Sequence, residues 1–205
     1  MKMEGLKFID LFCGIGGFRL GFESVGGECV FSSDWDRFSQ QTYEANFGEK
    51  PHGDIHEVAV EAIPTHDVLC AGFPCQPFSQ AGYKKGFQEN HENRGNMFFE
   101  IVSILQAKRP KAFFLENVRH LINHDSKRTF LTIRQTLQQL GYSFRYQMVK
   151  ASDFGLPQHR PRVFMVGFRD ETTNSSLFQF PKPIKLKKVN GLIQMKYKNY
   201  LKGTF

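Results

Sequence analysis

A cysteine between two prolines is the first candidate for chemistry. Cys75 lies in the segment Gly-Phe-Pro-Cys-Gln-Pro-Phe-Ser, residues 72–79, directly after the apolar run 67–71. Prolines fix φ and lack an N–H, so they hold the cysteine in one orientation. A lone cysteine is more often inert than nucleophilic, but this setting reverses that preference and makes Cys75 the candidate nucleophile. The other three cysteines lie in or beside apolar segments and are expected to be structural: Cys13, Cys29 and Cys70.

Charged side chains near the ends of two other apolar runs form the second group. Glu116 emerges directly from Phe-Phe-Leu, where low dielectric disfavours the carboxylate, raises the pKa and favours the protonated acid. A helix cap or an ion-pair partner is an equally weighted interpretation. Arg160 and Arg162 occupy alternate positions in Gln-His-Arg-Pro-Arg and so point to one face. They would clamp a phosphate or a base carbonyl, or hold a carboxylate; a solvated basic edge is the alternative.

A glycine-rich turn forms the third group. Residues 10–18 read Asp-Leu-Phe-Cys-Gly-Ile-Gly-Gly-Phe, and Asp34 follows seventeen residues after Gly17. Glycines let the backbone approach a ligand, and an acid at this distance suits the hydroxyls of a ribose. Trp35, the only tryptophan, would stack on an adenine. Because the third glycine is displaced to Gly21, the pattern indicates only a nucleotide-like cofactor; a glycine-rich turn with a core tryptophan is the alternative.

The elements that must position these groups alternate along the chain. Strands separated by helices of about ten residues predict βαβ units and a mostly parallel sheet, a Rossmann-like, doubly wound α/β fold. Such sheets bind ligands at the carboxyl ends of their strands, where the candidate groups gather. Residues 78–96 are polar and contain glycine, so we expect a long functional or disordered loop. The predicted strands cover 6–12, 28–33, 67–71, 111–115, 142–150 and 162–168, and the predicted helices 18–25, 36–47, about 95–108 and 126–140.

Composition excludes several classes of protein. The 205 residues, 40% of them hydrophobic and 23% charged, support one folded domain and exclude disorder of the whole chain. A mean hydropathy of −0.39 and the lack of an apolar run near ~20 residues exclude a transmembrane protein. Acids close to the first apolar stretch exclude a secretory signal, so we expect a cytoplasmic protein with free thiols. Without Cys-x-x-Cys spacing, and with only His120 and His124 as a histidine pair, we expect no metal.

The positive charge lies at one end. The chain has 27 basic and 20 acidic residues, and residues 172–205 hold seven lysines and no acid. Subtracting the seven leaves 20 bases against 20 acids for residues 1–171, a formally neutral body. The basic balance suits a polyanion partner. The tail lysines would contact phosphates or, as we favour, belong to the start of a further domain.

Taken together, six motifs resemble those of the DNA cytosine-5-methyltransferases, most closely the bacterial restriction–modification type. The motifs are DLFCGIGGF, SDWD, GDI, GFPCQPFS, ENV and QHRPR, in the order and spacing of that family, and the similarity runs from Phe8 to Pro183. The resemblance implies S-adenosylmethionine as the cofactor, with its ribose on Asp34, although the family more often has Glu there. The cofactor-binding residues that it implies are Phe12, Gly14, Gly16, Gly17, Phe18, Asp34, Trp35, Asp54, Ile55 and Pro74.

The resemblance also implies a reaction. Cys75 would attack C6 of a cytosine in double-stranded DNA, and Glu116 would bond to N3 and the amino edge of the base. Arg160 and Arg162 would support the activated base and the catalytic loop. Since C6 is shielded in a duplex, the base must be flipped out, and residues 78–96 are a candidate lid over it. The expected nucleic-acid contacts are Ser79, Lys84, Lys85, Arg94 and Gln158.

The sequence departs from the family at its C-terminal end. Family members continue into a target-recognition domain and return with an Asn-containing segment that completes the cofactor pocket. We therefore expect a catalytic and cofactor-binding domain at 1–180 and, at 181–205, a lysine-rich tail that begins a missing recognition region. Three hypotheses follow: a truncated methyltransferase of a restriction–modification system, half of a split enzyme completed by a separate chain, or a non-catalytic nucleic-acid or adenosylmethionine-binding module. One branch of the family methylates transfer RNA, but the restriction-type similarity favours DNA.

Overall fold

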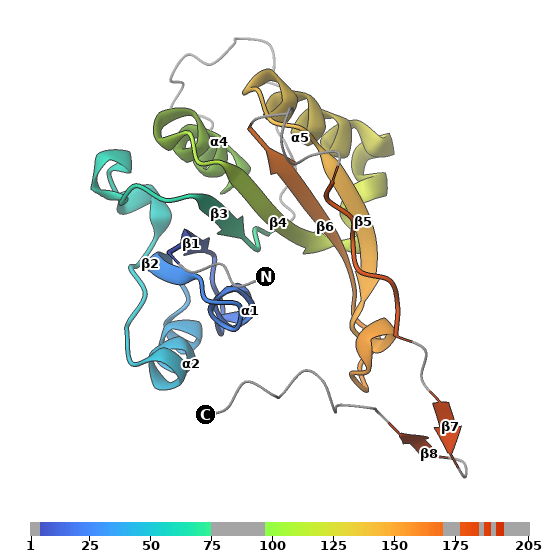
Figure 1. The fold of residues 1–205 in the computed structure, drawn as a ribbon. Helices are drawn as coiled ribbons and strands as arrows, with labels where there is room; N and C mark the ends of the chain where they lie inside the picture. Colours follow the sequence, from blue (N-terminus) through green and yellow to red (C-terminus); the bar gives the residue numbers. More distant parts are fainter. Residues whose placement is uncertain (1–4, 75–96, 170–176, 185–186, 190–191, 195–205) are drawn as a thin grey trace.

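A six-stranded sheet forms the centre of the computed structural model (Figure 1). The structure describes residues 5–74, 97–169, 177–184, 187–189 and 192–194. The sheet has the order β2-β1-β3-β4-β6-β5, and β6 runs antiparallel to both of its neighbours while the other pairs are parallel. The strands are β1 (Lys7–Leu11), β2 (Glu28–Ser33), β3 (Val68–Ala71), β4 (Ala112–Val118), β5 (Arg145–Lys150) and β6 (Pro161–Phe168). The mostly parallel α/β fold predicted from the sequence is confirmed.

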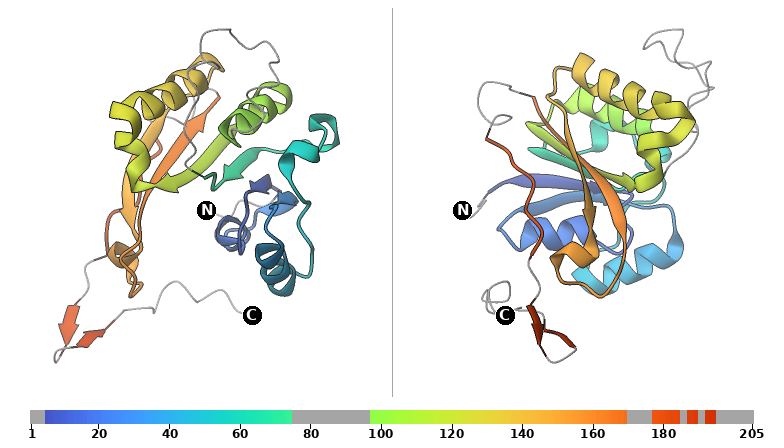
Figure 2. Two further views of the ribbon diagram at one scale, coloured as in Figure 1. Left: turned by 180° about the vertical axis from the view of Figure 1, so that it is seen from behind. Right: turned by 90° about the vertical axis from the view of Figure 1, so that its right-hand side faces the viewer.

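Helices cover both faces of this sheet. Figures 1 and 2 show α4 and α5 over one face, and α1 and α2 over the other, beside β1 and β2. The four helices are α1 (Gly17–Glu23), α2 (Arg37–Phe47), α4 (Met97–Lys108) and α5 (Arg128–Gln139). Short 3-10 turns connect some of the elements: η1 (Ile55–Glu57), η2 (Val60–Ala62), η4 (Arg119–Lys127) and η5 (Ala151–Phe154). A separate antiparallel hairpin consists of β7 (Lys187–Val189) and β8 (Leu192–Gln194).

Two apolar clusters follow from the alternation of side chains along the strands. Ile9 and Phe113 belong to the larger cluster, which also contains buried residues of α4 and α5. Phe8 and Ala112, one position earlier on the same two strands, belong to the smaller cluster, against which Phe22 of α1 packs. The central strands are therefore packed on both faces. No helix in the described ranges is long and apolar enough to cross a membrane.

Most predicted elements are present, and several of their ends differ from the predicted ones by up to three residues. The strand β4 continues through Glu116 to Val118, because residues 112–118 all pair with β6. The helix α5 begins at Arg128 rather than at 126, since Asp125, Ser126 and Lys127 all have positive φ. The strand β5 begins at Arg145 rather than at 142, because its pairing with β6 covers only residues 145–150. The loop predicted at 78–96 lies outside the described residues.

Candidate active site

The predicted glycine turn follows β1 and contains three residues with positive φ. Phe12, Gly14 and Gly16 have φ of +52°, +55° and +91°. The Gly16 N–H donates to the carbonyl of Cys13 at 2.9 Å, which closes the turn. A Cβ at Gly16 would lie 2.1 Å from the ring of Phe47, at the end of α2, so only glycine fits there. The turn therefore holds its backbone close to α2 and leaves Gly14 open on its other side, where a Cβ would meet nothing within 4 Å.

Asp34 binds this turn to the start of α2. Its Oδ2 accepts from the Gly14 N–H at 2.8 Å, and its Oδ1 accepts from the Asp36 N–H at 2.9 Å. Each carboxylate oxygen accepts two hydrogen bonds, so Asp34 retains capacity for a ligand hydroxyl. The side chain of Trp35 is 74% exposed, which contradicts the alternative that it is a core residue. An acid and an exposed aromatic ring therefore lie beside the glycine turn.

The segment that contains Asp54 and Ile55 lies next to the end of β2. The Asp34 N–H donates to the carbonyl of His52, and the His52 N–H donates to the carbonyl of Ser32. Asp54 caps η1, and its Oδ1 accepts from the backbone N–H of His56 at 3.0 Å. Burial opposes it, but the backbone N–H and the imidazole of His56 hold the pKa of Asp54 below its ordinary value. Asp34 and Asp54, the two acids of the predicted cofactor site, therefore lie on two segments that are hydrogen-bonded to each other near the end of β2.

Glu116 and Arg162 form the charged pair of the site. The Nε of Arg162 lies 2.7 Å from Oε1 of Glu116, and the two side chains are 19% and 22% exposed. Burial raises the pKa of Glu116 above its ordinary value, although Arg162 and Arg160 oppose the shift. A Cβ placed at Gly72 would lie 3.9 Å from Oε2 of Glu116 and 3.8 Å from the carbonyl of Phe12. The ends of β1, β3 and β4 therefore meet around this carboxyl group.

The other predicted residues of this edge are less tightly held. Arg160 and Gln158 are exposed, and the Arg160 N–H donates to the carbonyl of Gln158. Pro74 is exposed and is the last described residue before the gap. Gly17 and Phe18 begin α1, and the Phe18 ring packs on Phe114 of β4 at 5.2 Å between centroids. Five predicted residues lie outside the described ranges: Cys75, Ser79, Lys84, Lys85 and Arg94.

Asn117 is a positioning residue that the sequence reasoning did not assign. It is buried, and its Nδ2 donates to the carbonyl of Phe73 at 2.8 Å. Its Oδ1 accepts from the N–H of Val118. The residue therefore ties the end of β4 to the backbone that leads to Cys75. Its position directly after Glu116, in the motif Glu-Asn-Val, could have identified Asn117 as a candidate from the sequence.

Arg19 is a second residue that was missed. Its guanidinium lies 4.7 Å from the ring centroid of Phe47, and its Nε lies 2.7 Å from Oε1 of Glu23. Because Phe47 packs on Gly16, this buried arginine clamps α1 and α2 together behind the glycine turn. A buried arginine two residues after the turn has no distinctive spacing, so the sequence alone does not mark it.

The three described cysteines differ from the expectation for a nucleophile. Burial is the main cause that raises the pKa of Cys13 and of Cys70, and it raises the pKa of Cys29 to about 11. Since the thiolate is the reactive form, these three thiols are inert at neutral pH.

Asp10, on β1, is fully buried, and neither carboxylate oxygen has a hydrogen-bond partner in the described part of the chain. Burial raises the pKa of Asp10 well above 3.8, and the nearby Arg19 offsets this shift only in part.

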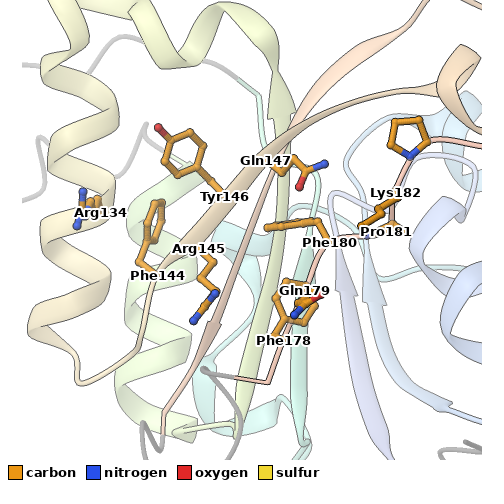
Figure 3. Close-up of a pocket in the computed structure, with 11 residues that line it drawn as sticks. Arg134, Phe144, Arg145, Tyr146, Gln147, Phe178, Gln179, Phe180, Pro181 and Lys182 are labelled. Atoms are coloured by element: carbon orange, nitrogen blue, oxygen red, sulfur yellow. The ribbon is translucent and has the colours of Figure 1, made fainter.

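A groove at the far edge of the sheet is separate from this site (Figure 3). Its volume is about 600 Å³, and β5 lies along it, with residues 178–183 forming much of its lining. None of the predicted site residues is among those that line it.

Across the described ranges, no group of three or more His, Cys, Asp or Glu side chains is arranged to hold a metal ion. The Nδ1 of His124 instead lies 2.7 Å from Oγ1 of Thr129.

Comparison with known proteins finds a matching family and curated relatives. The model of the C-5 cytosine-specific DNA methylase family matches residues 6–204. The chain is 50% identical over 185 residues to the type II methyltransferase M.HhaI of Haemophilus parahaemolyticus, covering 90% of this chain and 55% of that protein. It is 51% identical over 195 residues to M.DsaV of Dactylococcopsis salina, covering 95% of this chain and 55% of the relative. The chain thus spans about half the length of the curated relatives it matches.

Solved structures support the fold. The DNMT2 structure from Spodoptera frugiperda superimposes with a TM-score of 0.67 and 23% identity, covering 92% of this chain and 57% of that one. The Dnmt2 methyltransferase of S. pombe gives a TM-score of 0.62 and 21% identity, covering 80% and 49%. At these identities the likeness establishes a methyltransferase-type fold and nothing finer.

Proposed function

The chain belongs to the C-5 cytosine-specific DNA methylase family, and from that premise we propose that it carries the catalytic part of a DNA cytosine-5-methyltransferase of a restriction–modification system. The reaction transfers a methyl group from S-adenosylmethionine to C5 of a cytosine in double-stranded DNA. The observation that carries the proposal is the Glu116–Arg162 pair, which lies beside Gly72, three residues before the candidate nucleophile Cys75.

The residues around the glycine turn fit this cofactor. The open space at Gly14 admits a ligand against the backbone, and Asp34 retains acceptor capacity for the ribose hydroxyls. Trp35 offers an exposed face for the adenine, with Asp54 and the buried Ile55 on the neighbouring segment. When bound, the cofactor supplies an electrophilic methyl group on a sulfonium.

The protein has to activate C5 of cytosine, which is a poor nucleophile. The Cys75 thiolate would add to C6, forming a carbon–sulfur bond, and the ring would become an enamine with a nucleophilic C5. This C5 could take up the methyl group that the bound cofactor would supply, with the methyl–sulfur bond breaking and the thioether leaving. Glu116 in its protonated form donates to N3 and offsets the charge that develops during addition. Loss of the C5 proton to a base or a bound water then lets the thiolate leave. The raised pKa of Glu116 suits this role, because a larger fraction of the group carries a proton near neutral pH.

The two arginines act on the catalytic acid and on the DNA. Arg162 holds the Glu116 carboxyl group in place, and the exposed Arg160 is available to the base or to a phosphate. The target base is extruded from the duplex, since C6 is shielded within the stack. Residues 1–180 supply cofactor binding and catalysis, and 181–205 begin the region that reads the DNA site. A separate chain that supplies recognition of the DNA site is a proposed partner.

The test is a methyl-transfer assay with S-adenosylmethionine labelled in its methyl group. The chain is incubated with duplex DNA alone and together with the product of the neighbouring gene. We expect labelled 5-methylcytosine with the wild-type chain, none with Cys75→Ser, and cofactor binding in both. Full activity of Cys75→Ser would contradict the mechanism. Cofactor binding without transfer under either condition would favour the non-catalytic binding module.

A further inference from the structure

His56 lies between two carboxylate groups at the predicted adenine end of the site. Its Nδ1 lies 2.7 Å from Oδ1 of Asp54, and its Nε2 lies 3.8 Å from Oε1 of Glu100. His56 belongs to η1 and Glu100 to the first turn of α4. The imidazole is 20% exposed, so the ring is enclosed by its neighbours. One side chain therefore connects the segment after β2 with the helix that follows the gap at 75–96.

The contacts of Asp54 determine which way its carboxylate faces. Within the described part of the chain, Oδ1 accepts both the backbone N–H and the Nδ1–H of His56. An ionised carboxylate only accepts hydrogen bonds, so Nδ1 is the nitrogen that carries a hydrogen in this contact. With Oδ1 engaged twice, Oδ2 is the oxygen that remains to accept from a ligand.

The far side of the imidazole restricts its rotation. Nε2 is buried and makes no hydrogen bond of normal length within the described residues, but it faces the Glu100 carboxylate. A ring flip would exchange nitrogen for carbon at both positions and lose the 2.7 Å bond to Asp54. The ring is therefore held by its hydrogen bond to Asp54 and enclosed on its far side by Glu100, and it holds Asp54 in turn.

We propose that His56 is a positioning residue for the adenine of the cofactor. It aims Oδ2 of Asp54 at the exocyclic amino group, the donor that distinguishes adenine from purine, and links this contact to α4. The inference rests on the proposed function, because it presupposes that Asp54 lies beside the adenine ring. It assigns to His56 no contact with the cofactor itself.

The test compares two ligands by isothermal titration calorimetry. One is S-adenosylhomocysteine, and the other is its analogue with purine in place of adenine, which lacks the 6-amino group. We expect His56→Leu to weaken the first about tenfold, the effect of losing one hydrogen bond to a charged group, and the second less than about twofold. His56→Asn, whose side-chain amide places an N–H donor at the position of Nδ1, should recover most of the lost affinity.

A double-mutant cycle separates positioning from general destabilisation. In an Asp54→Ala background, His56→Leu should have no further effect on either ligand, because the group that it orients is absent. His66→Leu is the matched control, since His66 is also buried but lies before the amino end of β3. We expect this control to weaken both ligands by the same factor or neither.

Two results would overturn the inference while leaving the proposed function intact. Equal weakening of both ligands by His56→Leu would mean that the residue only stabilises the fold. Unchanged binding of both would mean that it does not orient Asp54. A wild-type chain that binds neither ligand, assayed alone or with its proposed partner, would contradict the proposed function and with it this inference.

Discussion

Arg162 and Glu116 are diagonal neighbours across the antiparallel strands β4 and β6. Glu116 pairs with Phe164 and Val118 pairs with Arg162, so the two charged side chains lie on one face, two positions apart in register. Their 2.7 Å contact therefore depends on the pairing of β6 with β4. The one strand of the sheet that runs against its neighbours delivers the arginine to the carboxyl end of a parallel strand.

Replacement of Glu116 tests its protonation. We expect Glu116→Gln to lower the rate of methyl transfer about 10²-fold and to leave cofactor affinity within about twofold of wild type, since the group acts on the base. Equal loss of rate and cofactor binding would make Glu116 structural.

The same variant has a predicted pH dependence of stability. Because the folded pKa of Glu116 is above its ordinary value of 4.5, its contribution is fully present below 4.5 and is lost as pH rises through the folded pKa. The stability of wild type relative to Glu116→Gln should therefore fall from pH 4 towards neutral pH, as measured by urea unfolding. If the stability of wild type relative to Glu116→Gln instead rose over that range, the ion pair with Arg162 would outweigh burial.

The contributions of Asp10 and Asp67 to folding stability should change with pH in opposite directions. Burial raises the pKa of Asp10, so wild type loses stability relative to Asp10→Asn as pH rises above 3.8. Lys111 and the Lys7 N–H lower the pKa of Asp67, so its contribution is present above 3.8 and is lost as pH falls through the lowered pKa. Urea unfolding of the two variants across pH checks both signs. Parallel pH profiles for the two would refute this account of their surroundings.

Two glycines of one segment should respond differently to a methyl group. Gly16→Ala places a Cβ against Phe47 at a φ of +91°, so we expect a loss of about 2–4 kcal/mol in unfolding free energy and weaker cofactor binding. Gly21→Ala, within α1, meets nothing within 4 Å and should gain about 0.5–1 kcal/mol. Opposite shifts of the urea midpoint are the expected result; a tolerated Gly16→Ala would mean that α2 can move away from the turn.

Asn117 should affect both stability and rate. Asn117→Leu leaves the buried carbonyl of Phe73 without its donor, so we expect a loss of about 1–3 kcal/mol in unfolding free energy. It should also slow methyl transfer more than it weakens cofactor binding, because it frees the backbone before Cys75. Asn46→Leu breaks an exposed bond of the same kind, to the carbonyl of Ile15, and should cost at most about 0.5 kcal/mol. Equal destabilisation by the two variants would contradict the positioning role of Asn117.

Local patterns were sufficient for the order of the elements. Short apolar runs identified β1, β2 and β3 nearly to the residue, because such runs and the glycines beside them are local signals. The ends of β4 and α5 were predicted less well. Pairing with β6 extends β4 past its apolar run, and the left-handed residues before α5 carry no glycine that would mark them.

The sequence by itself determined the family, the fold class and the group of residues at the carboxyl ends of the strands, because these depend on residue type, spacing and alternation. Only the tertiary structure decided that Arg162 rather than Arg160 contacts Glu116, that Trp35 is exposed, and that His56 lies between Asp54 and Glu100. Each of these contacts joins segments far apart in the chain or depends on which side of an element faces solvent. The packing of the whole sheet and its helices sets such relations, and no local pattern encodes them.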